Sequence, residues 1–268
     1  IDVAFVQGDV RDRAVVERAV QGCRGIIHLA AKVSVPGSVA DPMGFDDVNV
    51  RGFLTVLEAA RASRVSRVVY ASSSAVYGSA PELPKSETQS VQPESPYAAA
   101  KASNELYGAV YSATMGVDCV GLRYFNVFGP RQDPAGPYAA VIPRFVQQSL
   151  NGEPLTIYGD GEQGRDFVSV NDVARANIRA ALAQGVGGRV YNIGGGQMRT
   201  VNELAQMVLA EVTTGNGILS LGEREGDVRY SVAAIDRAVQ ELGWRPEANF
   251  GTALAETIQW YKQLFTDK

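Results

Sequence analysis

The chain has 268 residues, of which 46% are hydrophobic and 20% charged, and its formal net charge is −4. This length fits one large α/β domain or two modest ones, and the hydrophobic fraction is enough for a packed core, which excludes a disordered chain. The mildly acidic balance and the lack of any Lys/Arg run give no sign of nucleic acid or an anionic membrane as a partner.

The few cysteine and histidine residues exclude several further kinds of site. Two cysteines, Cys23 and Cys119, are too few for a disulfide framework, and the single histidine, His28, leaves no metal cluster to build. We therefore expect no metal site, and we expect a cytoplasmic location because no signal peptide and no run of about 20 apolar residues occurs. A Ser-His-Asp hydrolase would have to use His28, and no Gly-x-Ser-x-Gly elbow surrounds the serine run at 72–74.

The first part of the chain predicts alternating strands and helices. The expected elements are an interior strand at 1–6, an amphipathic helix through Val15, Val16, Ala19 and Val20, a strand at 25–29, a loop at 34–38, and a long helix from Asp46 to Ala62. This strand–helix–strand order is the unit of a parallel sheet.

The next strand ends in hydroxyl side chains. Residues 67–71 form a short apolar run that leads into Ser72-Ser73-Ser74, which is typical of a buried strand. Ligands bind at the carboxyl ends of strands in open α/β sheets. The proline-rich segment 79–95 predicts a loop over this site, and a helix is expected from Tyr97 to about Met115.

Tyr97 and Lys101 are four residues apart and therefore share one face of that helix. An ammonium about 4 Å from the phenol is worth about 4 kcal/mol at an effective dielectric constant of about 20. That interaction would lower the tyrosine pKa from about 10 to near 7 and make the phenol a general base. Chance pairing of Tyr and Lys at this spacing is the alternative.

The second half predicts further strands and helices. We expect a strand at 117–124, a helix from about 139 to 150, a turn at 155–161 leading into 165–170, a helix at 171–183 and a strand at 190–194 that rejoins the sheet, and then helices at 201–212 and 252–264 that frame the motif at 224–231.

The serine cluster followed about 25 residues later by Tyr97-x-x-x-Lys101 resembles the extended short-chain dehydrogenase/reductase family, and within it the nucleotide-sugar epimerases and dehydratases. The resemblance implies a Rossmann-like doubly wound parallel sheet, NAD as cofactor, and a smaller α+β C-terminal domain. It assigns 1–142 and about 166–195 to the NAD-binding domain. Residues 143–165 and about 196–268 would then bind the nucleotide sugar.

The resemblance also implies cofactor contacts. Those residues are Asp9 and Val10 at the adenine, Leu29, Ala30 and Ala31 at the nicotinamide side, and Asn49, Ser72, Tyr97, Lys101 and Tyr124. Two of them have plain structural alternatives, a turn or cap residue for Asp9 and a helix-surface amide for Asn49. We expect His28 to be structural.

Substrate contacts follow from the same resemblance. They are Ser34, Ser74, Asn126, Ala140, Val141, Tyr158, Arg165, Arg224, Asp227 and Ser231. Guanidinium groups suit the diphosphate of a UDP-sugar through their forked donors, which is the role implied for Arg165 and Arg224. Asp227 matches a ribose ligand, and small residues at Ala140 and Ser231 match those that leave room for an N-acetyl group.

The subfamily is read from Ser74-Ala75, where the related dehydratases carry an Asp-Glu pair and the decarboxylases a Glu. The resemblance therefore implies NAD-dependent 4-epimerisation, closest to the UDP-N-acetylglucosamine and UDP-glucose 4-epimerases. Tyr97 would be the base, Ser73 or Ser74 would share its hydrogen bond, and Lys101 would bind the nicotinamide ribose. The alternatives are another epimerase or dehydratase acting on UDP-glucuronate or a dTDP-sugar, and a non-catalytic binder.

The Gly-rich turn of the family, with its first two strands, roughly 55–60 residues, does not occur in the sequence. We expect that the sequence begins after this segment; a truncated, non-catalytic chain is the alternative. The resemblance also implies a homodimer, because related enzymes dimerise by packing the helices that match 45–62 and 97–115 into a four-helix bundle. Burial of the same helices against the sheet is the other interpretation.

Overall fold

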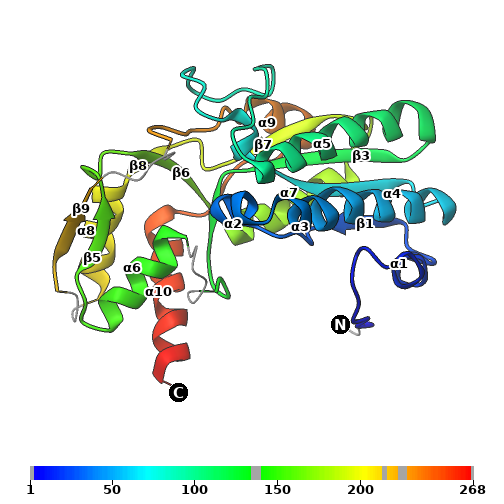
Figure 1. The fold of residues 1–268 in the computed structure, drawn as a ribbon. Coiled ribbons are helices and arrows are strands. Elements are labelled where there is room, and N and C mark those ends of the chain that lie inside the picture. The colour runs from blue at the N-terminus through cyan, green and yellow to red at the C-terminus, as the bar shows by residue number, and fades with distance from the viewer. Residues whose placement is uncertain (1–2, 134–139, 213–215, 223–227, 267–268) are drawn as a thin grey trace.

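The computed structural model describes residues 3–133, 140–212, 216–222 and 228–266 (Figure 1). The first half contains α1 (Arg13–Val20), β1 (Gly25–His28), α2 (Val35–Ala40), α3 (Pro42–Asp46), the π-helical turn η1 (Asp47–Arg51), α4 (Gly52–Ala62), β2 (Arg67–Ser73), the 3₁₀ turn η2 (Ser74–Tyr77), α5 (Pro96–Val110), the π-helical turn η3 (Tyr111–Met115), β3 (Asp118–Tyr124) and β4 (Asn126–Phe128). The second half contains α6 (Val141–Leu150), β5 (Leu155–Tyr158), β6 (Gly164–Ser169), α7 (Val170–Leu182), β7 (Val190–Ile193), β8 (Met198–Thr200), α8 (Val201–Glu211), β9 (Ile218–Leu221), α9 (Asp236–Leu242) and α10 (Phe250–Thr266).

A parallel sheet in the order β1-β2-β3-β7 forms the centre of the fold and confirms the predicted α/β class. The middle strands β2 and β3 are buried along almost their whole length, as expected for an apolar strand covered on both faces. Their register pairs Ser72 with Arg123 and Ser73 with Tyr124, so the serines end β2 beside the end of β3.

Helices cover both faces of this sheet (Figure 1). On one face, Phe53 and Leu57 of α4 pack with Val68 and Tyr70 of β2. On the other face, Val69 of β2 packs with residues of α7 and α9. Neighbouring residues of a strand point to opposite faces, so β2 contributes to both cores.

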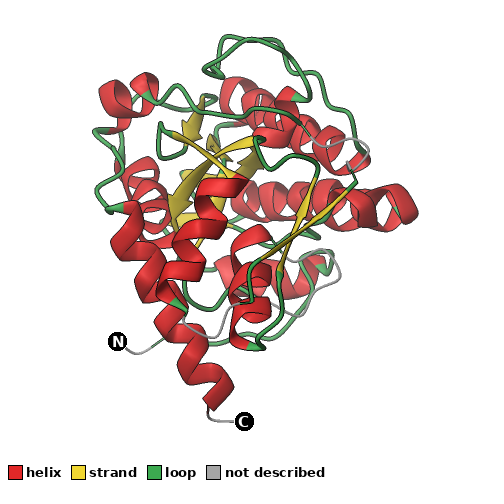
Figure 2. Ribbon diagram, turned by 90° about the vertical axis from the view of Figure 1, so that its left-hand side faces the viewer, coloured by secondary structure: helices red, strands yellow, loops and turns green. Residues whose placement is uncertain are grey.

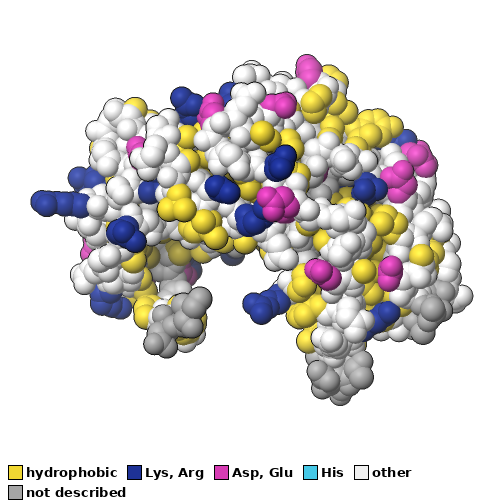
Figure 3. All heavy atoms as spheres, turned by 180° about the vertical axis from the view of Figure 1, so that it is seen from behind, with side chains coloured by type: hydrophobic (Ala, Val, Ile, Leu, Met, Phe, Trp, Pro, Cys, Tyr) yellow, Lys and Arg dark blue, Asp and Glu magenta, His cyan; other side chains and the backbone are white. Residues whose placement is uncertain are grey.

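The C-terminal part has a core of its own. Residues of α6, α8 and α10 pack with Leu155 and Ile157 of β5, and the small sheets β4-β6-β8 and β5-β9 lie beside them. Figure 2 views the molecule from this side, with α10 running to the C terminus. Seen from behind, the molecule is hollowed between the part that carries α1 and the part that ends in α10 (Figure 3).

Three predicted elements differ from the structure. Residues 3–8 form no strand, and Val3 and Phe5 are 78% and 87% exposed, because β1 pairs only with β2 and no described strand lies beside this segment. The predicted loop at 34–38 is mostly helix α2, because the Ser34 side chain caps it and Pro36 suits its first turn.

The long helix predicted from Asp46 begins earlier. Asp41 accepts a hydrogen bond from the Gly44 N–H and caps α3, which continues through η1 into α4. The π-helical turn η1 contains Asn49, and such turns occur often at functional sites. Within the described ranges, no helix is long and apolar enough to cross a bilayer.

Candidate active site

Tyr97 and Lys101 both lie on the first two turns of α5, which begins where Ser95 accepts a hydrogen bond from the Ala98 N–H. Their helix face is directed at the end of β2. The Lys101 ammonium is almost fully buried and donates to the Ala71 carbonyl oxygen at 2.8 Å, and it lies 5.8 Å from the centroid of the Tyr97 ring. The predicted pairing of these two side chains is therefore present.

Ser73 joins this pair from the end of β2. Its hydroxyl shares a hydrogen bond with the Tyr97 phenol and also accepts one from the Ala75 N–H at 3.2 Å, which begins η2. Ser74 is the first residue of that turn. The structure thus brings together the four predicted catalytic residues, Tyr97, Lys101, Ser73 and Ser74, at the carboxyl edge of the sheet.

The predicted lowering of the Tyr97 pKa by Lys101 is wrong for the chain on its own. Burial raises the pKa of Tyr97, and only the Ser73 hydrogen bond acts to lower it. Burial also lowers the pKa of Lys101 to about 8. The physical reason is that desolvation opposes both charged forms, while the ammonium is held by a backbone carbonyl.

Ser72 lies at the same strand end, but its hydroxyl is directed elsewhere. It donates to the Glu105 carboxylate at 2.5 Å, and Glu105 receives two further hydrogen bonds from Arg123 at 2.7 and 2.8 Å. Sequence reasoning missed Glu105 and Arg123. The signal was available for Glu105, because it follows Lys101 by four residues and therefore continues the face that carries Tyr97.

Small residues line the sheet edge beyond β1. Leu29 and Ala30 are exposed, and Ala31 is half-buried. Asn49 is only 1% exposed and holds the next residue of this segment, since it accepts from the Lys32 N–H at 2.8 Å and donates to the Lys32 carbonyl at 3.0 Å. The helix-surface interpretation of Asn49 is therefore wrong.

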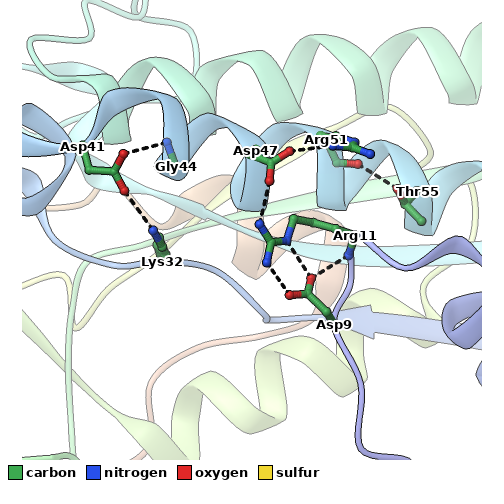
Figure 4. A network of polar contacts seen from close by, with 8 residues as sticks. All are labelled: Asp9, Arg11, Lys32, Asp41, Gly44, Asp47, Arg51 and Thr55. Carbon is green, nitrogen blue, oxygen red and sulfur yellow. Dashed lines mark hydrogen bonds and ion pairs between the residues drawn. The ribbon is translucent and has the colours of Figure 1, made fainter.

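A charged network supports the same edge (Figure 4). Arg11 donates to Asp9 at 2.6 and 2.9 Å and to Asp47 of η1 at 2.6 Å, and Arg51 donates to Asp47 as well. The hydrogen bonds from Arg11 lower the pKa of Asp9 to about 2. Asp9 is therefore an ionised acceptor fixed beside the half-buried Val10, which suits the adenosine contact implied for both residues.

His28 takes a structural place, and the Tyr124 hydroxyl has a partner on α7. The His28 ring stacks on Phe53 with centroids 5.5 Å apart, and burial lowers its pKa to about 4, so it is a neutral packing residue as expected. The Tyr124 hydroxyl donates to Asn177 at 2.9 Å.

Part of the predicted substrate set gathers around β6. Arg165 donates to the Gly164 carbonyl at 2.9 Å, and the Ser231 N–H donates to the same carbonyl at 3.1 Å. Asn126 of β4 pairs in register with Phe167 of β6. Arg165, Ser231 and Asn126 thus converge on one strand, as a shared substrate would require.

The other substrate residues are more scattered. Tyr158 ends β5, where the Arg144 guanidinium lies 5.3 Å from its ring centroid. Ala140 precedes α6 and Val141 begins it. The Ser34 hydroxyl is used as the α2 cap, and Arg224 and Asp227 lie outside the described residues.

Asp166, next to Arg165, organises the surrounding loops. Its carboxylate is fully buried and accepts from the N–H groups of Gly195 at 2.5 Å, Gly196 at 3.0 Å and Ala233 at 3.0 Å. Burial outweighs these hydrogen bonds and raises its pKa to about 6. Asp166 therefore ties the segment of Ser231 to β6.

A cavity of about 250 Å³ lies beside the C-terminal half of β6. Phe128, Phe167, Arg199 and Phe250 are among its lining residues, and Arg199 stacks on Phe250 at 4.5 Å. None of Tyr97, Lys101 and Ser73 lines it. The catalytic chemistry of the chain is therefore separate from this cavity.

The residues at the sheet edge fit the predicted NAD. Among the described residues, the Lys101 ammonium donates to one acceptor, the Ala71 carbonyl, which leaves two of its three N–H donors for a ligand. A buried ammonium with two remaining N–H donors suits the hydroxyl groups of a ribose, which can accept hydrogen bonds from it. The small side chains of the exposed Ala30 and the half-buried Ala31 let a ligand approach the backbone.

Comparisons with known proteins agree with this geometry. Residues 1–194 match the NAD dependent epimerase/dehydratase family. The UDP-N-acetylglucosamine 4-epimerase from Methanobrevibacter ruminantium M1, solved with UDP-N-acetylmuramic acid, is 40% identical with a TM-score of 0.93 over 97% of this chain and 83% of its own. The UDP-glucose 4-epimerase of Thermus thermophilus, solved with NAD, is 36% identical with a TM-score of 0.88 over 97% and 79%.

A dehydratase is almost as similar. The dTDP-glucose 4,6-dehydratase of Streptomyces niveus is 37% identical over 96% of this chain and 76% of its own length. Both kinds of relative act on nucleotide sugars, as their names say. On the matched residues, the parallel sheet and the Tyr97–Lys101 site, the chain belongs to the NAD-dependent epimerase/dehydratase family of nucleotide-sugar enzymes, with NAD as its cofactor.

Proposed function

We propose that the protein interconverts the C4 epimers of a UDP-sugar, with UDP-N-acetylglucosamine and UDP-N-acetylgalactosamine as the pair. The observation that carries the proposal is the composition of η2. Ser74 and Ala75 follow the Ser73 that bonds Tyr97, and no residue of η2 is acidic. Loss of water across C5 and C6 needs a proton acceptor and a proton donor there, whereas reversible oxidation at C4 does not.

The chain's own residues supply the proton chemistry at C4. The Tyr97 phenol, ionised when the site is loaded, takes the proton of the sugar 4-hydroxyl, and the Ser73 hydroxyl shares that hydrogen bond. When bound, NAD would supply the hydride acceptor, and then the hydride donor, for C4 of the sugar. The 4-keto sugar turns about its diphosphate between the two transfers, so its other face receives the hydride and Tyr97 gives the proton back.

Lys101 has two tasks in this scheme. Its ammonium holds the ribose of the cofactor, and it stabilises the phenolate of Tyr97 on the same helix face. Bringing a dinucleotide phosphate and a diphosphate sugar into the site adds negative charge near the ammonium, which favours its protonated form. The Tyr97 phenol therefore becomes a general base when the cofactor and the substrate bind beside Lys101.

The substrate is proposed from the anchors around β6. Arg165 and Arg224 are assigned to the diphosphate and Asp227 to the uridine ribose. The short side chains of Ala140 and Ser231 leave space for an N-acetyl group. The similarity to the Methanobrevibacter ruminantium UDP-N-acetylglucosamine 4-epimerase supports this choice.

A product analysis separates the candidate reactions. The purified protein is incubated in turn with UDP-N-acetylglucosamine, UDP-glucose and dTDP-glucose, and the products are identified by proton NMR. The proposal predicts UDP-N-acetylgalactosamine. A 4-keto-6-deoxy sugar from dTDP-glucose would instead assign the dehydratase reaction of the Streptomyces niveus relative, and the Tyr97→Phe protein, prepared in the same way, controls for contaminating activity.

We also propose the two-domain division at 1–142 with 166–195 against 143–165 with 196–268, supported by the separate core of α6, α8 and α10. A homodimer through α5 and the α3–α4 helix is a further proposal. Phe53 and Leu57 are buried toward the sheet, yet Leu106 and Val110 of α5 are 72% and 50% exposed. Exposed apolar side chains on one helix face favour an interface there.

A further inference from the structure

One face of α5 is attached to three consecutive residues of β2. Tyr97, Lys101 and Glu105 are spaced at four-residue intervals and therefore line up along the helix. Tyr97 bonds the Ser73 hydroxyl and Lys101 bonds the Ala71 carbonyl. Glu105 accepts from the Ser72 hydroxyl at 2.5 Å and so fixes the residue between the other two.

Glu105 is itself held from a neighbouring strand. Arg123 of β3 donates to both carboxylate oxygens at 2.7 and 2.8 Å, and its side chain is 4% exposed against 10% for Glu105. A bidentate pair of this kind fixes the plane of the carboxylate. Since Ser72 pairs in register with Arg123, the carboxylate bridges α5 to the ends of both strands.

The network extends to the loops around the site. Arg123 also donates to the Tyr77 hydroxyl at 2.8 Å, and Tyr77 donates to the Asn192 side chain at 2.7 Å. Asn192 in turn donates to the carbonyl of Lys85 at 2.8 Å. The ion pair is thus held by Tyr77 as well, and the Ser72 hydroxyl links the pair to the end of β2.

We propose that Glu105 is a positioning residue for the proposed reaction: through Ser72 it fixes the end of β2, so that the Ser73 hydroxyl is directed at Tyr97 in the geometry that proton transfer needs. This inference rests on the proposed function. Glu105 touches neither substrate nor cofactor in this role. The Ser72 hydroxyl, directed at Glu105, is then a structural link and not the cofactor contact that the family resemblance implies.

The test removes the link and keeps the ion pair. Ser72→Ala deletes one hydroxyl while Glu105 and Arg123 stay paired, which avoids a buried unpaired charge that could prevent folding. We expect kcat per folded protein to fall about ten- to a hundredfold, as for other small displacements of catalytic groups, with unchanged KM for the UDP-sugar and unchanged affinity for NAD. Ser103→Ala is the matched control, because that hydroxyl bonds the Ala99 carbonyl within α5.

Each outcome decides one of the two claims. A wild-type protein without product contradicts the proposed function, whereas an active wild type with a fully active Ser72→Ala variant contradicts the positioning role. Weaker NAD binding by the Ser72→Ala variant would show that Ser72 contacts the cofactor, and this result would also overturn the proposal. Hydrogen exchange of residues 70–78 gives a readout independent of substrate: it should accelerate in Ser72→Ala, and unchanged exchange overturns the proposal.

Discussion

The Lys101 ammonium is bonded to the Ala71 carbonyl at 2.8 Å and stands 5.8 Å from the Tyr97 ring centroid, buried against the end of β2. Without ligands its burial is unfavourable, since desolvation lowers its pKa to about 8 from an ordinary value of 10.5. This placement makes Lys101 unfavourable for the stability of the cofactor-free protein and useful for catalysis.

Lys101→Met should stabilise the cofactor-free protein at pH 7 by about 2 kcal/mol while abolishing most turnover, because a shift of this size outweighs one lost hydrogen bond. Between pH 8 and 10.5 the unfolded chain binds the proton that folded Lys101 has released, so wild-type stability rises with pH there. The advantage of the variant should therefore shrink across this window. Urea unfolding of both proteins from about pH 7 to 10.5 measures it, and a constant difference would contradict the buried charge.

If Tyr97 is the general base, removing its phenol oxygen should strongly lower kcat. Tyr97→Phe should lower kcat by a factor of about 10² to 10⁴, the usual contribution of a general base, and leave UDP-sugar binding within about twofold. Tyr107→Phe, a change of the same size at an exposed position of the same helix, should keep full activity. Near-normal turnover in the Tyr97 variant would remove it from the proton transfer.

Asn49 should matter through the backbone that it holds. Asn49→Ala removes two hydrogen bonds to Lys32 and should cost about 2 kcal/mol in the free energy of unfolding, with weaker NAD binding. Asn104→Ala is the comparison, because its equally buried side-chain oxygen has no hydrogen-bond partner among the described residues. Equal losses in the two variants, measured by urea unfolding and NAD titration, would argue against a specific clamp.

The proposed dimer rests on α5. Leu106→Glu places a charge in the expected interface and should yield a folded monomer in light scattering after size-exclusion chromatography. Val239→Glu, on α9, introduces the same charge at another exposed apolar position and should leave the assembly unchanged. A Leu106→Glu protein that keeps the wild-type mass would place the interface elsewhere.

The parts that were predictable are those with strong local patterns. The apolar runs at β2 and β3, the helix that begins with Ser95-Pro96-Tyr97, and the four-residue spacing of Tyr97 and Lys101 all locate correctly, because burial, capping and helix periodicity are encoded in neighbouring residues. The same patterns misplaced residues 3–6. That segment is as apolar as a strand, but a strand also needs a hydrogen-bonding neighbour, which periodicity does not report.

Other features depend on the tertiary structure alone. Arg123 reads as an ordinary strand residue until the register sets it beside Ser72, and the spacing that puts Glu105 on the face of Lys101 does not show that Arg123 pairs with it. The pKa of Tyr97 was predicted from one neighbour, whereas burial decides its direction. Long-range pairing and desolvation are therefore the information that the sequence pattern lacked.

The fate of the C4 hydrogen tests the central claim most directly. The protein is incubated with UDP-N-acetylglucosamine deuterated at C4, and the product is analysed by NMR and mass spectrometry. Hydride transfer to tightly held NAD and back predicts UDP-N-acetylgalactosamine that keeps its deuterium at C4. Loss of that deuterium to solvent, or a product changed at C6, would contradict reversible oxidation at C4 as the reaction of this enzyme.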